Sequence, residues 1–456
     1  MKDLTRGPVV GHLFALAVPI AVGMLVQTLY FLVDLYFVSR LGATALAGVG
    51  SAGNLMFLVI ALGQVLSVGT VATVSHAVGA QDRPRASLMF HQAVLVAGVL
   101  AATTLAAGYL GPADAYVRSV AADAATVEAG TTYLRWFLPA MALQFATTAM
   151  AAALQGTGIV KPTMVVQMLT VLVNIVLTPV LVAGWGTGRP MGVAGAGLAS
   201  TLAAATGVAM MAFYFASLEH YIGFERERLA PRPEALRRML EIGLPAGGEL
   251  GLMFVYIAVI YRVVSPFGAS AQAGFGAGVR VMQAVFLPAM AIAFAVPALA
   301  GQNFGAREGG RVRETFRKAV LLIAGFMLAL TLLCQWRPGW LVAPFASDPR
   351  ALAVAAGFMT IVSWNFVASG LTFTCSGMFQ GMGNTLPALA ASATRLVTFV
   401  PPAFWLLHRP GYRIQHVWYL SVTSVTIQAL VSLLLLRRQL RRRLRFDDGA
   451  PATGPA

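Results

Sequence analysis

The chain has 456 residues, of which 58% are apolar and 11% charged, and its formal net charge is +15. A water-soluble domain carries about 25% charged residues, so most of this chain must face lipid rather than water. The basic residues lie in short segments between apolar runs and not on one face. This pattern favours the loops of a membrane protein, and we expect no nucleic-acid partner.

Twelve apolar runs are long enough to cross a bilayer, for which a helix needs about 20 residues. The first run follows a basic start but continues without a small-residue cleavage site, so it predicts a retained span and not a signal peptide. The sequence therefore predicts an all-α membrane protein. The expected spans are 10–39, 47–74, 87–111, 132–154, 162–184, 192–217, 239–263, 271–300, 314–335, 352–377, 385–407 and 416–436.

The chain repeats itself after 226 residues. The run 41–50 (LGATALAGVG) returns as 267–276 (FGASAQAGFG), Pro19 returns as Pro245, and Tyr30 returns as Tyr256. We therefore expect two pseudo-symmetric bundles of six helices. Because each repeat has an even number of spans, the repeats are parallel. A duplicated bundle is typical of a secondary transporter whose substrate path lies between the halves and which works by alternating access.

Four segments follow from this repeat. Residues 1–216 form the first lobe, 217–238 a polar cytoplasmic linker, 239–436 the second lobe and 437–456 a basic cytoplasmic tail. Lys and Arg concentrate in the alternate connections that share a side with both termini, which places both termini in the cytoplasm. The basic tail is expected to lie against anionic lipid headgroups.

Asp34 is a charged residue inside the first span, where charge is costly and usually functional or paired. Gln27, Tyr30 and Asp34 recur at i, i+3 and i+7, so they share the polar face of an otherwise apolar helix. This face should point into a cavity, where a carboxylate can take up a proton from one side and release it on the other. The alternative is that Asp34 pairs with Arg40 near the interface.

The fifth span carries Asn174 and Thr178 one turn apart, directly before Pro179. An (i, i+4) pair presents both side chains to the same neighbour, and the proline frees a backbone carbonyl. These oxygen-rich groups suit a carboxylate partner, a proton relay or a small cation. Interhelical hydrogen bonding without a transport role is an equally good interpretation.

Glu249, Arg280 and Arg395 are charged residues in the second repeat. Glu249 lies in the seventh span, where it can bind a cationic substrate, carry the coupling ion or pair with one of the two arginines. The arginines are expected to fix the geometry of the lobe or to face the substrate. Together with Gln27, Tyr30 and Glu249, two further tyrosines complete the expected substrate cavity: Tyr36 and Tyr256.

Prolines are expected to interrupt several spans, and interrupted spans can supply hinges for alternating access. The candidates are Pro19, Pro245, Pro288 and Pro297. Ordinary tolerance of proline in membrane helices is the alternative.

Residues for enzyme chemistry are scattered. Cys334 and Cys375 have no CxxC partner, and the six histidines lie near span ends. We therefore expect no metal site and no cofactor, and the chain is not expected to be an enzyme.

Short motifs along nearly the whole chain resemble the multidrug and toxic-compound extrusion (MATE) transporters, closest to the bacterial DinF-like branch. Each motif is weak alone, but their order, spacing and duplication make the resemblance specific. They are the runs 3–6, 27–42 and 155–158, the pair 79–80, the run 301–306 and the run 380–384.

The resemblance implies an antiporter in the bacterial cytoplasmic membrane that expels amphipathic, often cationic compounds in exchange for protons or sodium ions. Asp34 matches the aspartate that carries coupling in the DinF-like branch, and Ser200 falls where the family often has a hydroxyl. Asn174 also matches, but Thr178 replaces an aspartate, which favours protons over sodium. Glu249 lies about a turn earlier than the seventh-span glutamate of the sodium-coupled NorM-like branch.

The expected function is thus a proton-driven multidrug efflux antiporter, with Asp34, Asn174, Thr178 and Ser200 as coupling residues. Small-molecule drugs, dyes and membrane lipids are the expected partners, and we expect a monomer. A flippase for lipids or lipid-linked saccharides is the alternative, which Arg280 and Arg395 keep open.

Overall fold

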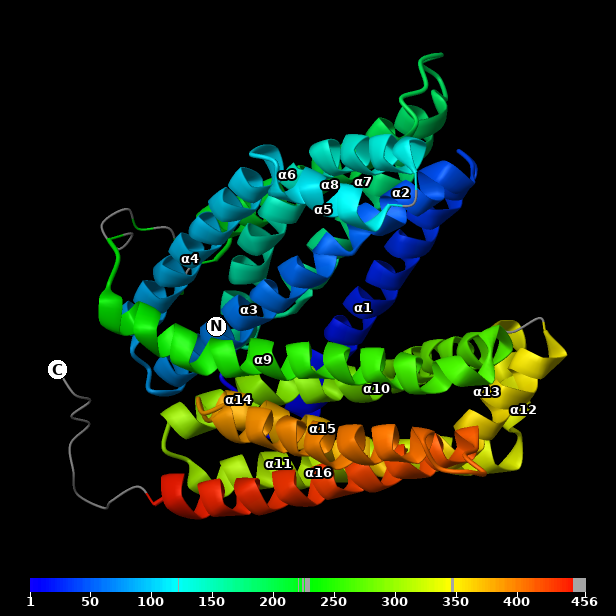
Figure 1. Cartoon of the computed structure of the whole chain (residues 1–456). Coiled ribbons are helices and arrows are strands. Elements are labelled where there is room, and N and C mark those ends of the chain that lie inside the picture. Colours follow the sequence, from blue (N-terminus) through cyan, green and yellow to red (C-terminus); the bar gives the residue numbers. More distant parts are fainter. Residues whose placement is uncertain (122, 220, 224, 226–229, 346–347, 446–456) are drawn as a thin grey trace. The chain divides into compact units, whose positions relative to one another are not determined.

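The structure is a computed structural model of the whole chain, and it describes residues 1–121, 123–219, 221–223, 225, 230–345 and 348–445. These residues form helices and connecting turns, and they contain no strand (Figure 1). The α-helices are α1 (Val9–Ser39), α2 (Ala43–Gly53), α3 (Leu55–Gly79), α4 (Arg83–Tyr109), α5 (Pro112–Val120), α6 (Ala124–Gly156), α7 (Lys161–Ala183), α8 (Val193–Ser217), α9 (Pro233–Val264), α10 (Ala269–Gly305), α11 (Gly309–Trp336), α12 (Pro338–Val342), α13 (Pro349–Val362), α14 (Asn365–Gly381), α15 (Leu386–Leu407) and α16 (Ile414–Arg443).

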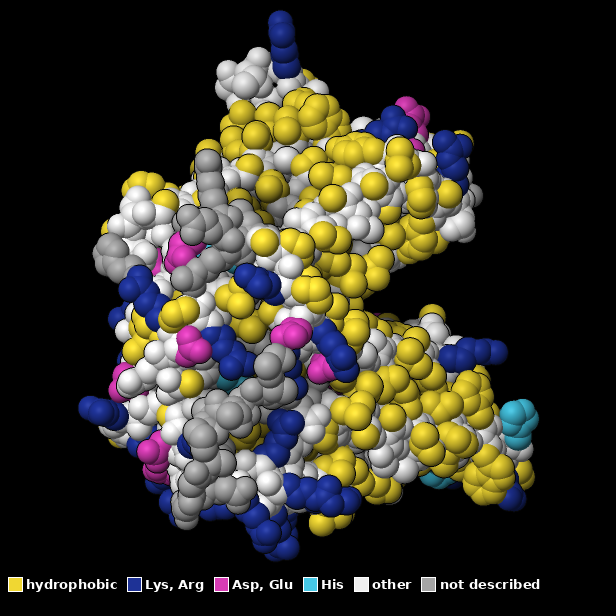
Figure 2. All heavy atoms as spheres, turned by 90° about the vertical axis from the view of Figure 1, so that its left-hand side faces the viewer, with side chains coloured by type: hydrophobic (Ala, Val, Ile, Leu, Met, Phe, Trp, Pro, Cys, Tyr) yellow, Lys and Arg dark blue, Asp and Glu magenta, His cyan; other side chains and the backbone are white. Residues whose placement is uncertain are grey.

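Eleven of these helical segments, with α2 and α3 taken as one, are long and apolar enough to cross a membrane. A twelfth span is formed by α13 and α14, which are bent by 62° at a short break. The chain is therefore a multi-pass all-α membrane protein, as the hydropathy pattern predicted. Figure 2 shows how much of the visible surface hydrophobic side chains cover, as lipid contact requires.

The prediction that prolines interrupt the spans is wrong for the described helices. Pro19 lies inside α1, Pro245 inside α9, and both Pro288 and Pro297 inside α10, and each helix continues through them. Helices can carry proline in a membrane because neighbouring groups take up the freed carbonyl. The break between α13 and α14 instead falls at Ser363 and Trp364, where the sequence has no proline.

Aspartate side chains start several helices. The Asp123 carboxylate accepts a hydrogen bond from the backbone N–H of Thr126 at the start of α6, and Asp348 accepts one from Arg350 at the start of α13. Such caps satisfy N–H groups that have no partner within the helix. The same backbone hydrogen bonds hold the pKa of both carboxyl groups below their ordinary value.

The first compact unit, unit 1, comprises residues 1–2, 18–78 and 82–247. Its core is built where α6 packs against α2, α4 and α8, and α8 packs in turn against α7. Small residues allow the close approach: a Cβ on Gly48 would lie 2.7 Å from the backbone nitrogen of Gly130. The first half of α9 adds Ile242 and Ala246 to a small apolar cluster with Val68 and Ala72 of α3.

The second compact unit, unit 2, comprises residues 3–17, 79–81 and 248–456. Here α10 packs against α11, α13 and α14, and α16 packs against α14 and α15. The N-terminal segment belongs to this unit. Leu4 is fully buried; its N–H donates to Gln302, and its carbonyl accepts hydrogen bonds from Asn303 and Arg311.

The two units divide the chain differently from the boundaries at residues 216 and 239 that the repeat suggested. The divisions fall inside helices, between Ala17 and Val18 in α1 and between Gly247 and Gly248 in α9. The first half of each of these helices packs with helices of the other repeat. The backbone contacts of Leu4 and the apolar cluster around Ile242 account for this exchange.

Candidate functional sites in each unit

Unit 1 encloses a cavity of about 290 Å³, which we call the Tyr30 cavity. It is lined by residues of α1, α3, α6, α7 and α8 and mixes aromatic, aliphatic and hydroxyl or amide side chains. Such a mixture suits amphipathic ligands, because apolar walls bury area while a few polar groups orient the ligand. The polar lining residues are Gln27, Tyr30, Ser67, Gln144, Thr147, Thr148, Gln155, Thr163, Gln167, Thr170 and Ser200.

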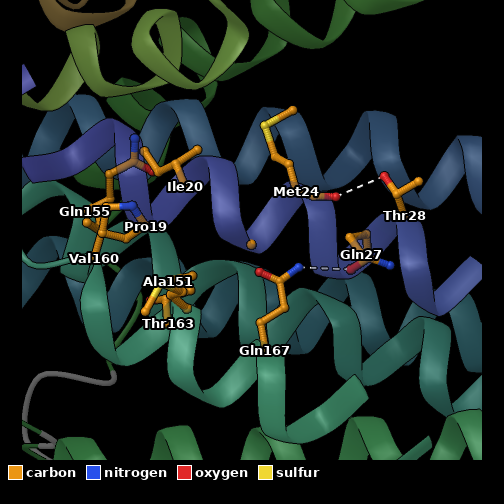
Figure 3. A pocket seen from close by; sticks show the side chains of 12 residues that line it. Pro19, Ile20, Met24, Gln27, Thr28, Ala151, Gln155, Val160, Thr163 and Gln167 are labelled. Atoms are coloured by element: carbon orange, nitrogen blue, oxygen red, sulfur yellow. Dashed lines mark hydrogen bonds between the residues drawn. The ribbon is translucent and has the colours of Figure 1, made fainter. Parts of the chain in front are cut away.

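A second cavity of unit 1, which we call the Pro19 cavity, has a volume of about 430 Å³. Figure 3 shows its lining residues, which come from α1, α6 and α7 and from the start of α7. Five residues line both cavities: Gln27, Ala151, Gln155, Thr163 and Gln167.

Asp34 lies one turn beyond Tyr30 on α1. The Tyr30 hydroxyl donates a hydrogen bond of 2.7 Å to Ser200 Oγ on α8, and both residues line the Tyr30 cavity. The Asp34 carboxylate interacts electrostatically with the phenol groups of Tyr30 and Tyr133. Its Oδ1 atom is buried and has no hydrogen-bond partner among the described residues, so the carboxylate has a vacant acceptor.

The alternative pairing of Asp34 with Arg40 is not seen. The Arg40 guanidinium lies 4.5 Å from the centroid of the Tyr36 ring instead. Tyr36 is 50% exposed and lines neither cavity of unit 1, although the sequence suggested a place in the substrate cavity.

Asn174 and Thr178 are both fully buried on α7, and the Thr178 hydroxyl donates to Asn174 Oδ1 at 3.3 Å. Asn174 Nδ2 is buried without a partner among the described residues. The two residues continue a polar stripe along α7 that sequence reasoning missed. Its positions i, i+4, i+7, i+11 and i+15 share one helix face, a spacing that could have revealed it. The stripe consists of Thr163, Gln167, Thr170, Asn174 and Thr178.

Unit 2 holds Glu249 in a hydrogen-bonded group of side chains, which we call the Glu249 network. Ser376 Oγ donates to one carboxylate oxygen at 2.8 Å, and Ser392 Oγ donates to the other at 3.5 Å. Gln380 and Gln428 donate in turn to the two serine hydroxyls. Four helices, α9, α14, α15 and α16, therefore fix the position of this carboxylate.

The arginines of unit 2 do not pair with Glu249 in the described structure. The Arg395 guanidinium lies 3.5 Å from the centroid of the Tyr256 ring, a cation–π contact, and its Nε atom is buried without a partner among the described residues. Tyr256 also shares a 2.8 Å hydrogen bond with Ser421. Arg280 is exposed on α10.

The repeat relates the sites of the two units. The hydrogen bond between Tyr30 and Ser200 in unit 1 corresponds to that between Tyr256 and Ser421 in unit 2. Glu249 corresponds to Gly23 at the offset of 226 residues, and Gly23 lines the Pro19 cavity. Unit 2 therefore has a hydrogen-bonded carboxylate at the position where unit 1 has open space.

No group of three or more His, Cys, Asp or Glu side chains that could hold a metal ion occurs in the part of the chain that the structure describes. The chemistry available at both sites is that of single carboxylates with hydroxyl and amide partners. Such groups can bind a proton, a small monovalent cation or an organic cation.

Comparison with known proteins agrees with this architecture. The MatE family model matches the chain twice, over residues 19–180 and 245–405. The chain is 24% identical over 441 residues to the probable multidrug resistance protein YoeA of Bacillus subtilis, covering 94% of each chain. It is also 24% identical over 447 residues to the multidrug export protein MepA of Staphylococcus haemolyticus, covering 95% of this chain and 94% of that one.

A solved structure of a multidrug resistance MATE family transporter in an outward-facing conformation has the same fold. The TM-score is 0.88 at 25% identity, and the match covers 96% of this chain and 98% of that one. The family match spans both repeats, and its two parts begin 226 residues apart, as the internal duplication does. The chain therefore belongs to the MATE family of multidrug efflux transporters.

Proposed function

We propose that the chain is a proton-driven antiporter that expels amphipathic, cationic organic compounds by alternating access. Its location is the bacterial cytoplasmic membrane, with both termini in the cytoplasm. Asp34 carries the coupling proton. One elementary charge that moves down 100 mV supplies about 2.3 kcal/mol, which supports roughly a 50-fold substrate gradient.

The observation that carries this proposal is the vacant, buried Oδ1 of Asp34 beside the Tyr30 cavity. An unpartnered buried acceptor is costly, and protonation of the carboxyl group or a bound cation relieves that cost. Protonated and ionised Asp34 then favour different packings of α1, and each packing opens the substrate path on a different side. Thr178 in place of the family's aspartate removes one negative charge from this region, which supports a proton over a sodium ion.

The substrate class is inferred from the site and from the relatives. The cavities of unit 1 combine apolar and amide groups, and Glu249 adds one carboxylate in unit 2. Relatives such as MepA carry multidrug export in their names. Few polar groups in an apolar cavity suit broad specificity.

The test is ethidium efflux from proteoliposomes, driven separately by a pH gradient and by a sodium gradient. We expect the pH gradient alone to drive transport, and Asp34→Asn to reduce it to the level of empty vesicles while the protein still folds. Asp114→Asn is the matched control, since Asp114 pairs with Arg135 and lines neither cavity. Wild-type rates for the Asp34→Asn protein would rule out the coupling role, and transport driven only by sodium would rule out the proton.

A further inference from the structure

The two cavities of unit 1 meet at a shared wall. Gln27 of α1, Ala151 and Gln155 of α6, and Thr163 and Gln167 of α7 line both of them. The Tyr30 cavity continues from this wall toward Tyr30 and Ser200, and the Pro19 cavity continues toward Pro19 and Val160 at the start of α7. Whatever separates the cavities is therefore built from these five side chains.

A hydrogen bond crosses the wall from α7 to α1. Gln167 Nε2 donates to Gln27 Oε1 at 3.0 Å (Figure 3). The other end of the Gln167 amide rests on α1 one turn earlier, where a Cβ on Gly23 would lie 2.6 Å from Gln167 Oε1. The amide is thus held against two successive turns of α1, and a residue other than glycine at position 23 would displace it.

Polar groups continue on both sides of this bond. Thr163 lines both cavities, and its buried hydroxyl has no partner among the described residues. An unsatisfied buried hydroxyl costs about 1–3 kcal/mol, and an ordered water relieves that cost. Cavities of about 430 and 290 Å³ hold several waters, because one water takes about 30 Å³ of the liquid.

We propose that the Gln27–Gln167 hydrogen bond is the gate of a hydrated proton path that links Asp34 with the end of unit 1 where α7 begins. The path follows the polar stripe of α7. With the bond made, the waters of the two cavities are separated. With the bond broken, both amides turn toward water and the file becomes continuous. The proton of the Asp34 carboxyl group then passes to a water, leaving the carboxylate, and moves along the file as hydronium.

The repeat explains why the gate belongs to unit 1. In unit 2 the positions of Gly23 and Gln167 hold Glu249 and Ser392, which hydrogen-bond to each other. Ser376 and Gln428 complete that group. A carboxylate fixed by two hydroxyl groups occupies the place of the cavity, so the path is a feature of one unit only.

Thiol accessibility tests the gate without any transport measurement. Ala203 lines only the Tyr30 cavity and Met164 only the Pro19 cavity, so Ala203→Cys and Met164→Cys report on the two sides. The natural cysteines, Cys334 and Cys375, are fully buried in unit 2 and give the background rate. The probe is 2-aminoethyl methanethiosulfonate added to purified protein.

We expect Gln167→Ala to raise the reaction rate of the Ala203→Cys thiol about tenfold, the factor that about 1.4 kcal/mol of lost hydrogen bonding produces. Gln27→Ala should do the same, and the double variant should add nothing, because the two residues share one bond. The rate at Met164→Cys should stay within about twofold. Gln144→Ala, which removes an amide from the Tyr30 cavity alone, should leave both rates unchanged.

An unchanged rate at Ala203→Cys in both Gln167→Ala and Gln27→Ala would overturn the gate. So would additive effects in the double variant. If Gln167→Ala does not fold, Gln27→Ala and the isosteric Gln167→Leu carry the same test. This proposal rests on Asp34 as the proton carrier, yet the two fail separately: lost accessibility control leaves efflux untested, and failed proton coupling leaves the accessibility result intact.

Discussion

Glu249 is a carboxylate that unit 2 holds rigidly between two serine hydroxyls. The change Glu249→Gln keeps the size of the side chain but removes its charge. We expect affinity for permanent cations to fall about tenfold, because a carboxylate in a medium of reduced dielectric attracts an organic cation. The ion dependence of transport should not change, because Asp34 is untouched. Binding of ethidium and tetraphenylphosphonium to purified protein, with zwitterionic norfloxacin for comparison, measures the effect.

Ser392→Ala is the control for this substitution, because it removes the longer hydrogen bond at 3.5 Å and leaves the charge in place. Its effect on cation affinity should be smaller than that of Glu249→Gln. Equal affinity of the Glu249→Gln protein for every cation tested would remove Glu249 from the substrate site. A changed ion dependence would move it into the coupling machinery.

Single helices could be interpreted at the residue scale from the sequence, whereas partners between helices could not. The polar face of Gln27, Tyr30 and Asp34 follows from helical spacing alone. The Tyr30 partner Ser200 lies 170 residues away, and the Glu249 partners lie 127 and 143 residues away. No local periodicity encodes such distances. Gln167 was missed because an amide in an apolar run resembles ordinary interhelical hydrogen bonding.

The bent span formed by α13 and α14 depends on side chains of α11. Gln335 Nε2 donates to the Thr360 carbonyl at 2.7 Å and to Ser363 Oγ at 2.9 Å, and the Thr331 hydroxyl donates to the Ser363 carbonyl at 2.9 Å. These bonds satisfy backbone groups that the break sets free, and such groups have no water to bind in the bilayer.

Gln335→Leu should therefore destabilise the protein by about 1–3 kcal/mol, because it leaves the Thr360 carbonyl buried without this partner. The melting temperature in detergent, followed by the fluorescence of a thiol-reactive dye, measures the loss. Gln415→Leu, an exposed glutamine at the start of α16, is the matched control and should change stability little. An unchanged melting temperature for Gln335→Leu would show that the break needs no support from α11.

At the scale of elements, hydropathy predicted the spans but not their interior. Residues 363–365 interrupt the predicted span 352–377 without lowering its mean hydropathy enough to be seen, so the break was missed. The predicted start of the fourth span at residue 132 was too late, because α6 begins at Ala124 with several polar residues in its first turns. Window averages locate apolar segments but do not register helix caps such as Asp123.

At the scale of the molecule, the duplication was readable because both copies keep glycines and prolines at matched positions. The exchange of the first halves of α1 and α9 between the compact units was not, since it depends on packing by residues such as Leu4 and Ile242. The charge pattern adds orientation. The last turns of α16 carry exposed Arg437, Arg438, Arg441 and Arg442, and Lys and Arg gather on the end of unit 2 seen in Figure 2.

The arginines at the end of α16 predict a cytoplasmic C-terminus, because positively charged segments stay on the side of synthesis. The segment between α7 and α8, which contains Gly188, then lies outside. Alkaline phosphatase fused after Ala456 should be inactive and green fluorescent protein fused there should fluoresce; fusions after Gly188 should show the reverse. Replacing the four arginines by glutamine should leave this topology unchanged, since the eleven preceding spans are already inserted and further Lys and Arg remain in earlier segments on the same side. Active phosphatase after Ala456 would invert the orientation, and the proton path beside α7 would then lead to the outside.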